Sequence, residues 1–149
     1  MNAISASLDL AHWDWTAWYM ETACERLVKS LDRPEMEFEI EFFERVLARD
    51  ADHVEALYCL GHLYTESCRY GKGLAVDERL ARLCPNDPLA HYNLACSYSL
   101  TEKVDKSLEV LARAIRLGYR DYKHMSVDPD LANVRSSPGW QRLMDLKLA

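Results

Sequence analysis

The chain has 149 residues, hydrophobic residues at 49% of its positions and a formal net charge of -6. This length suits one domain, because a domain of roughly 150 residues buries on the order of 70% of its unfolded surface. The acidic balance opposes nucleic acid as a partner, since phosphate binding needs clustered cations. No apolar run approaches the ~20 residues of a membrane-spanning helix, and no basic residue precedes Arg26 as a signal peptide would require. We therefore expect a cytoplasmic protein that contacts no membrane.

Residues 1–19 are rich in aromatic side chains and carry little charge. Their apolar positions recur at helical spacing, which predicts a helix that caps the N-terminal end of the domain. Trp13 points to another side of this helix, so the tryptophan-rich segment is also the candidate contact for a homo-oligomer. The apolar stripe consists of Ile4, Leu8, Ala11, Trp15 and Trp18.

Residues 20–53 predict two helices separated by the break at Asp32-Arg33-Pro34. Both helices carry an apolar stripe, and we expect them to form a helix pair of degenerate sequence. The first stripe is Met20, Ala23, Leu27 and Leu31, and the second is Phe38, Phe42, Phe43, Val46 and Leu47.

Residues 54–87 and 88–121 can be laid on one another with an offset of 34 positions. Each unit predicts two antiparallel helices, with turns expected at 69–72 and 100–103. Asp87 is placed to cap the helix that begins with Pro88, and Gly118 is placed to end the last helix of the second unit. In the first helices the core positions are Leu57, Leu60, Gly61 and Tyr64, followed by Leu94, Ala95 and Tyr98.

Residues 122–149 predict two short helices that close the open end of the domain. Asp128-Pro129 and Ser137-Pro138 each have the pattern of a capping residue followed by a proline in the first helical position.

The 34-residue period and its pattern resemble the tetratricopeptide repeat family. Agreement is best in 54–121, and the tail is similar to segments that close bacterial arrays. The resemblance implies an all-α, right-handed α-solenoid of about three helix-turn-helix units with N-terminal and C-terminal capping helices. The agreeing residues are Leu57, Leu60, Gly61, Tyr64, Tyr70, Pro85, Leu94, Ala95, Tyr98 and Ala114, and the departures are Asp77, Leu80, Ser107, Leu111 and Tyr119.

The family resemblance also implies a concave groove, lined by the first helix of each unit, that holds a peptide or a helix of another protein. The sequence spacing supports a shared face in 54–87, where four of the positions form a stripe beside the core positions. The expected binding residues are Glu55, Tyr58, His62, Thr65, Glu66, Leu89, Tyr92, Asn93, Cys96, Ser99 and Leu100, with Tyr58, His62 and Tyr92 as anchors and the glutamates selecting a basic or polar partner. The alternative is that Tyr58 and Tyr92 pack on the neighbouring helix or on the chain's own tail.

One class of partner is not expected. Family members that bind chaperone tails hold a terminal carboxylate with lysine, asparagine and arginine side chains. Asn93 and Lys123 match that clamp, but Tyr58, His62 and Val127 stand at its other positions.

The predicted function is therefore a non-catalytic adaptor for protein-protein interactions. One alternative is a secretion-type chaperone of the same family that dimerises through its N-terminal helix, and another is a structural assembly subunit. No enzyme motif, cofactor or metal site is expected, because the Cys59 and His62 pair falls short of the roughly four converging ligands of a zinc site. The five cysteines are expected as reduced thiols.

Overall fold

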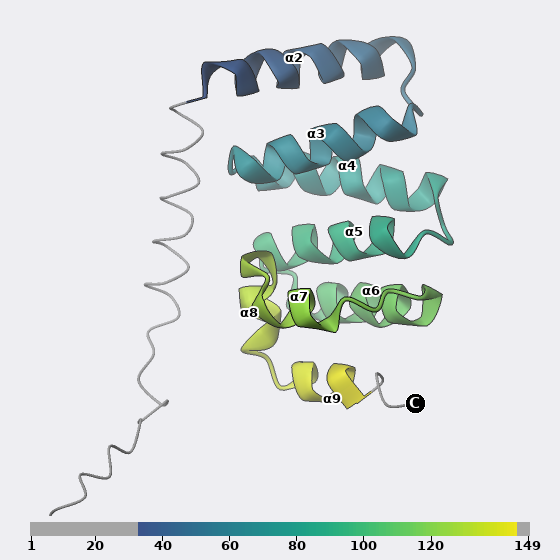
Figure 1. The fold of residues 1–149 in the computed structure, drawn as a ribbon, viewed down its shortest axis with the longest axis vertical. Helices are drawn as coiled ribbons and strands as arrows, with labels where there is room; N and C mark the ends of the chain where they lie inside the picture. Colours follow the sequence, from purple (N-terminus) through teal and green to yellow (C-terminus); the bar gives the residue numbers. More distant parts are fainter. Residues whose placement is uncertain (1–32, 146–149) are drawn as a thin grey trace, which may run out of the picture.

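The computed structural model describes residues 33–145, and all regular structure within that range is helical (Figure 1). The helix expected over 1–19 and the first helix of 20–53 lie outside the described residues. The described helices are α2 (Pro34–Arg49), α3 (Val54–Glu66), α4 (Tyr70–Leu83), α5 (Pro88–Leu100), α6 (Val104–Leu117), α7 (Tyr122–Val127), the 3-10 helix η2 (Pro129–Leu131), α8 (Ala132–Arg135) and α9 (Gly139–Asp145).

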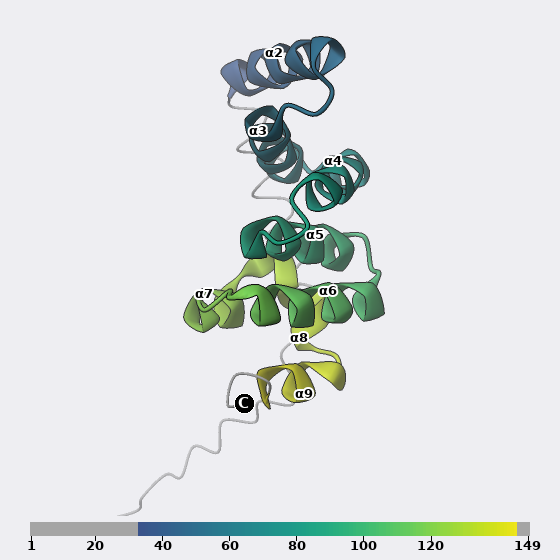
Figure 2. The same cartoon turned by 90° about the vertical axis from the view of Figure 1, so that its right-hand side faces the viewer.

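The helices from α2 to α6 form a stack in chain order. Each of them contacts the next, and the two orthogonal views show the series running along the long axis of the molecule from α2 to α9 (Figures 1 and 2). The segment from η2 to α8 turns back onto α5, while α9 packs on α6. A cleft can therefore form where the returning segment faces the stack.

The turns after α3 and α5 have the same geometry at positions 34 residues apart. Cys68 and Glu102 both adopt a left-handed backbone, with φ of 58° and 62°. The amide of the next residue donates in each case to a tyrosine carbonyl, Arg69 to Tyr64 at 2.7 Å and Lys103 to Tyr98 at 2.8 Å. The turns cover residues 67–69 and 101–103, whereas 69–72 and 100–103 were expected, because α4 already begins at Tyr70 and α5 ends only at Leu100.

Two side-chain contacts of these helix pairs also recur at the same offset. The hydroxyl of Tyr64 donates to Glu44 at 2.5 Å, and that of Tyr98 donates to Glu78 at 2.9 Å. The ammonium groups of Lys72 and Lys106 lie 5.4 and 5.6 Å from the centres of these two tyrosine rings. The sequence period is therefore matched by repeated contacts in the structure.

The core is a series of small clusters between consecutive helices that ends in a larger cluster built by the tail. Each fully buried leucine in these clusters contributes ~1.5–3 kcal/mol to stability. Three small clusters are centred on Met36, Ile40 and Leu60, on Leu57, Leu80 and Ala90, and on Leu74, Ala81 and Leu94. The largest joins Ala95, Leu111, Ala114 and Ile115 to Met125, Leu131, Val134 and Leu143 of the tail.

Several predicted helix ends are confirmed. The Asp87 side chain caps α5 by accepting hydrogen bonds from the amides of Leu89 and Ala90, and Gly118 ends α6 with a φ of 116°. Asp128 caps η2 as its sequence pattern indicates. The interpretation of Ser137-Pro138 is wrong, because α9 begins at Gly139 and the Ser137 hydroxyl donates to the carbonyl of Val134.

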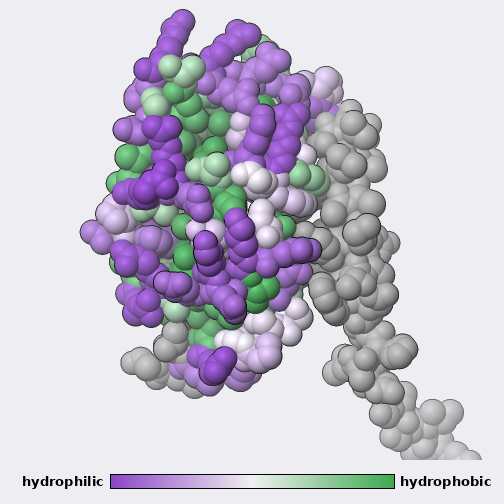
Figure 3. All heavy atoms as spheres, turned by 180° about the vertical axis from the view of Figure 1, so that it is seen from behind, coloured by the Kyte–Doolittle hydropathy of each residue, from purple (hydrophilic) through white to green (hydrophobic). Residues whose placement is uncertain are grey.

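One face of the described region is largely polar. Figure 3 shows hydrophilic side chains over much of the face opposite to that of Figure 1, with apolar atoms between them. The largest exposed apolar side chains include Phe38 and Phe42 on α2, which are 70% and 52% exposed. No helix within residues 33–145 combines the length and the apolar character needed to cross a bilayer.

Candidate functional site

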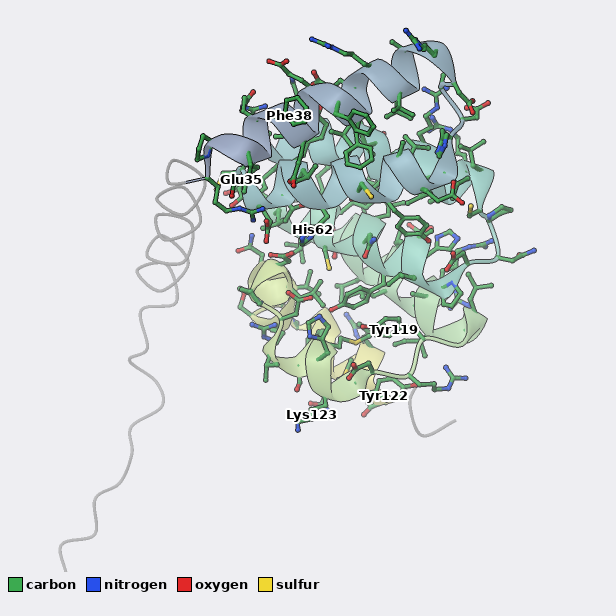
Figure 4. The ribbon with its side chains drawn as sticks, turned by 45° about the horizontal axis from the view of Figure 1, so that its top comes forward. Glu35, Phe38, His62, Tyr119, Tyr122 and Lys123 are labelled. Atoms are coloured by element: carbon green, nitrogen blue, oxygen red, sulfur yellow. The ribbon has the colours of Figure 1, made fainter. Side chains whose placement is uncertain are left out.

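A cleft of about 350 Å³ opens between α3, α5 and the returning C-terminal segment. Helix α3 supplies one wall, α5 supplies a second, and the third comes from α7 and the start of η2. Figure 4 shows His62 on α3 facing the C-terminal helices. The lining residues are Gly61, His62, Thr65, Asp77, Tyr92, Asn93, Cys96, His124, Asp128, Pro129 and Asp130.

The structure brings five of the eleven predicted binding residues together in this cleft. They are His62 and Thr65 of α3 and Tyr92, Asn93 and Cys96 of α5. Helical spacing explains the grouping, because residues three or four apart share one face of a helix. The predicted residues outside the lining are Glu55, Tyr58, Glu66, Leu89, Ser99 and Leu100.

Tyr92 is a fixed wall of the cleft and not an exposed anchor. Its side chain is 4% exposed, its ring stacks on Tyr119 with centroids 4.2 Å apart, and its hydroxyl donates to Asp128 at 2.5 Å. Burial raises the pKa of Tyr92 far above its ordinary value, so the ring stays neutral. Packing on the chain's own tail, the alternative expected from sequence, describes this residue correctly.

Tyr58 joins two helices and lies outside the cleft. Its hydroxyl donates to Asp87 at 2.7 Å, while the other carboxylate oxygen of Asp87 accepts the amide of Leu89 at 2.8 Å. Burial and the bond to Asp87 raise the pKa of Tyr58. Tyr58 therefore holds the start of α5 against α3, which is a structural role.

The other predicted residues outside the cleft differ in exposure. Leu89 is 48% exposed at the start of α5, whereas Ser99 and Leu100 at its end are buried. Glu66 pairs with Arg33 at 3.1 Å and with His62 at 3.5 Å. Glu66 thus borders the cleft through His62, whereas Ser99 and Leu100 are buried outside its lining, so the cleft is smaller than the groove predicted from the sequence.

Asp77 contributes a buried carboxylate to the cleft. It is 4% exposed, and the Ser97 hydroxyl donates to its Oδ2 at 2.6 Å. The missing side chain of Gly61 makes room for it, because a Cβ there would lie 2.7 Å from the Asp77 Oδ1. Burial raises the pKa of Asp77 to about 6, although the bond from Ser97 acts in the opposite direction.

The C-terminal wall is organised around Asp128, which is itself buried. One carboxylate oxygen accepts the amide of Asp130 at 2.9 Å, and the other accepts the Tyr92 hydroxyl and lies 3.2 Å from Nε2 of His124. The guanidinium of Arg135 donates to the Asp128 backbone carbonyl. Asp128 thereby fixes the returning segment on α5.

A possible metal-ligand group lies within this wall. The Cys96 thiol and carboxylate oxygens of Asp128 and Asp130 all lie within 4.8 Å of one another. Burial raises the pKa of the Cys96 thiol well above its ordinary value, whereas metal binding requires the thiolate. The hydrogen bonds already made by Asp128 compete with coordination as well, so the geometry favours a hydrogen-bonded wall.

The chain matches no family model. Over 56 residues it is 39% identical to a chloroplastic protein from Arabidopsis thaliana. That stretch is 38% of this chain and 17% of the plant protein, so the chain corresponds to a small part of its relative.

Four titratable residues that line the cleft were not among the predicted site residues: Asp77, His124, Asp128 and Asp130. One signal was visible, since Asp77 departs from the repeat pattern and lies 16 positions after Gly61. The other three belong to the tail, whose return onto α5 has no periodic signature in the sequence.

Proposed function

We propose that the chain is a non-catalytic adaptor that holds a segment of another protein in the cleft between α3, α5 and η2. The observation that carries this proposal is the convergence of His62, Thr65, Tyr92, Asn93 and Cys96 on one cleft. The same five residues are predicted from the sequence alone as binding positions.

The proposed scaffold is a right-handed solenoid of tetratricopeptide repeat units. The repeated left-handed turns at Cys68 and Glu102 support it, as do the matching bonds of Tyr64 and Tyr98. Such units stack side by side and present their first helices on one face. In this chain the cleft lies between two first helices, α3 and α5, which are the elements expected to line a binding groove.

The cleft is suited to binding because much of it is already ordered. The Tyr92 ring is held by its stack and its hydrogen bond, so little side-chain entropy remains to be lost there when a ligand binds. Asn93 and Thr65 add polar groups able to donate and accept hydrogen bonds. A volume of about 350 Å³ suits one or two side chains of an extended segment.

The proposal is tested by filling the cleft. In Asn93→Trp the indole occupies space that a ligand would need, whereas in Ala75→Trp the same side chain is placed on an exposed position of α4 outside the lining. Each variant and the wild type are used as bait in a native lysate, and captured proteins are quantified by mass spectrometry. We expect Asn93→Trp to lose proteins that the wild type and Ala75→Trp retain. Equal capture by all three baits would refute the proposal.

A further inference from the structure

We propose that the cleft takes the side chain of a lysine or arginine from the bound segment, with Asp77 as the buried counter-ion. This inference rests on the proposed function, because it names the chemistry of the partner at the same site. It follows from the charge of the cleft, from the position of the Asp77 carboxylate and from the space above it.

The lining of the cleft is acidic. It includes the carboxylates of Asp77, Asp128 and Asp130, and among the described residues no lysine or arginine belongs to it. His124 lies beside Asp128, and the half-buried Arg135 is bound to the Asp128 carbonyl. Both groups lie at the C-terminal wall, and among the described residues no cationic side chain pairs with Asp77.

Asp77 is the group that points to a ligand. It is 4% exposed, and its bond from Ser97 engages Oδ2 alone. Among the described residues no hydrogen bond or ion pair engages Oδ1, which belongs to a side chain that lines the cleft. Buried carboxylates are ordinarily paired, because an unpaired charge in a poorly solvated site is unfavourable. A cationic side chain entering the cleft would supply the missing partner.

Gly61 keeps that carboxylate accessible. A Cβ at this position would lie 2.7 Å from Oδ1, so any other residue would displace the carboxylate or cover it. Thr65 and Asn93 line the same cleft with uncharged polar groups. A guanidinium or ammonium group could therefore pair with Asp77 while its remaining N–H groups find neutral acceptors.

A bound metal ion is the weaker explanation of this charge. The atoms within metal-binding distance of one another belong to Cys96, Asp128 and Asp130, and that group does not include Asp77. Burial also raises the pKa of the Cys96 thiol, which favours its uncharged form. A flexible basic side chain does not need several ligands in a fixed geometry and can reach Asp77 directly.

The experiment uses the full chain and short glycine-serine peptides that differ at one central residue. One peptide carries arginine, the second lysine, and the third citrulline, which has nearly the shape of arginine without its charge. Binding is followed at low salt by two-dimensional NMR of the labelled protein. We expect the arginine and lysine peptides to shift the amide signals of Gly61 and Asn93, and the citrulline peptide to bind at least about tenfold more weakly.

Two matched variants localise the effect. Asp77→Asn keeps the shape of the side chain and its acceptor for Ser97 but removes the charge, and we expect at least about a tenfold loss of affinity for the arginine peptide. Asp52→Asn removes an exposed carboxylate outside the cleft, paired with Arg79, and is expected to bind as the wild type does. If Asp77→Asn does not fold, the comparison of the arginine and citrulline peptides on the wild-type chain still decides whether binding depends on charge.

The inference is overturned if the citrulline and arginine peptides bind equally, or if Asp52→Asn weakens binding as much as Asp77→Asn. It is also overturned if the signals that shift lie away from the cleft. The two experiments can disagree. If Asn93→Trp captures fewer proteins but the peptides bind without a charge preference, the adaptor function stands and only the basic side chain is rejected. If Asn93→Trp captures the same proteins as the wild type but peptide binding depends on charge, the adaptor function is rejected and the cation-binding cleft stands.

Discussion

The buried carboxylate of Asp77 should make the stability of the protein depend on pH in a defined direction. Its pKa is about 6 in the folded chain, against an ordinary value of 3.8. The folded state therefore holds this proton more tightly than the unfolded state does. The resulting stabilisation is fully present below about pH 4 and is lost as the pH rises through about 6. We expect Asp77→Asn to remove this dependence, because asparagine does not ionise.

The size of the effect follows from the shift. A rise from 3.8 to about 6 corresponds to ~3 kcal/mol at 1.36 kcal/mol per pKa unit. About half of it, ~1.4 kcal/mol, falls between about pH 5 and about pH 7.5. The unfolding free energy of Asp77→Asn minus that of the wild type should therefore increase by this amount across that interval. Any pH-independent cost of the substitution cancels in the comparison.

Urea unfolding followed by circular dichroism at both pH values measures this difference. A second variant, Ser97→Ala, removes the hydrogen bond that favours the charged carboxylate and should raise the pKa of Asp77 further. Its loss of stability relative to the wild type should thus be greater at the higher pH. A difference for Asp77→Asn that is constant or falls with pH would refute the assignment of a raised pKa to this buried group.

Three further predictions concern stability and are checked by urea midpoints. Gly61→Ala should lower the unfolding free energy by ~1–3 kcal/mol, because the added methyl group would lie 2.7 Å from the Asp77 carboxylate. Gly71→Ala, where the added Cβ meets open space, should leave the unfolding free energy unchanged or raise it by up to ~1 kcal/mol. Equal effects of the two substitutions would contradict the steric argument. Asp87→Ala should cost ~1–2 kcal/mol through loss of the cap of α5, and an unchanged midpoint would show that the cap is dispensable. Tyr119→Leu should lower the unfolding free energy by ~0.5–1.5 kcal/mol, because its ring loses the stack on Tyr92. The same substitution made in a Tyr92→Leu background should have no such effect, because the stack is already absent there.

Local signals in the sequence located helix ends well where one residue dictates the backbone. Asp87 before Pro88 and Gly118 after α6 are such cases, because a capping carboxylate and a left-handed glycine act within one turn. The turn before α4 was placed too late, since its left-handed residue is Cys68, which has no intrinsic preference for that conformation. Ser137 was misinterpreted because serine hydroxyls donate to carbonyls as readily as they cap helices.

Part of the candidate site was predicted from helical spacing and part from the family resemblance. His62 and Thr65 belong to the stripe that helical spacing defines on α3, Cys96 and Asn93 were expected from the resemblance, and all four line the cleft. The burial of Tyr92 depends on a contact with a residue 36 positions later, and periodicity within one helix carries no information about such a contact. The departure of Tyr119 from the repeat pattern marked the place where the tail meets α5, although its meaning required the structure.

Gly61 and Asp77 share a single volume, and this links their substitution in related chains. A relative with a side chain at the position of Gly61 should carry a residue smaller than aspartate at the position of Asp77, because the Cβ and the carboxylate cannot both be accommodated. The hydroxyl of Ser97 would then lose its acceptor, so a third position should change with the first two. An alignment of relatives should therefore show these three positions varying together, even though each lies on a different helix.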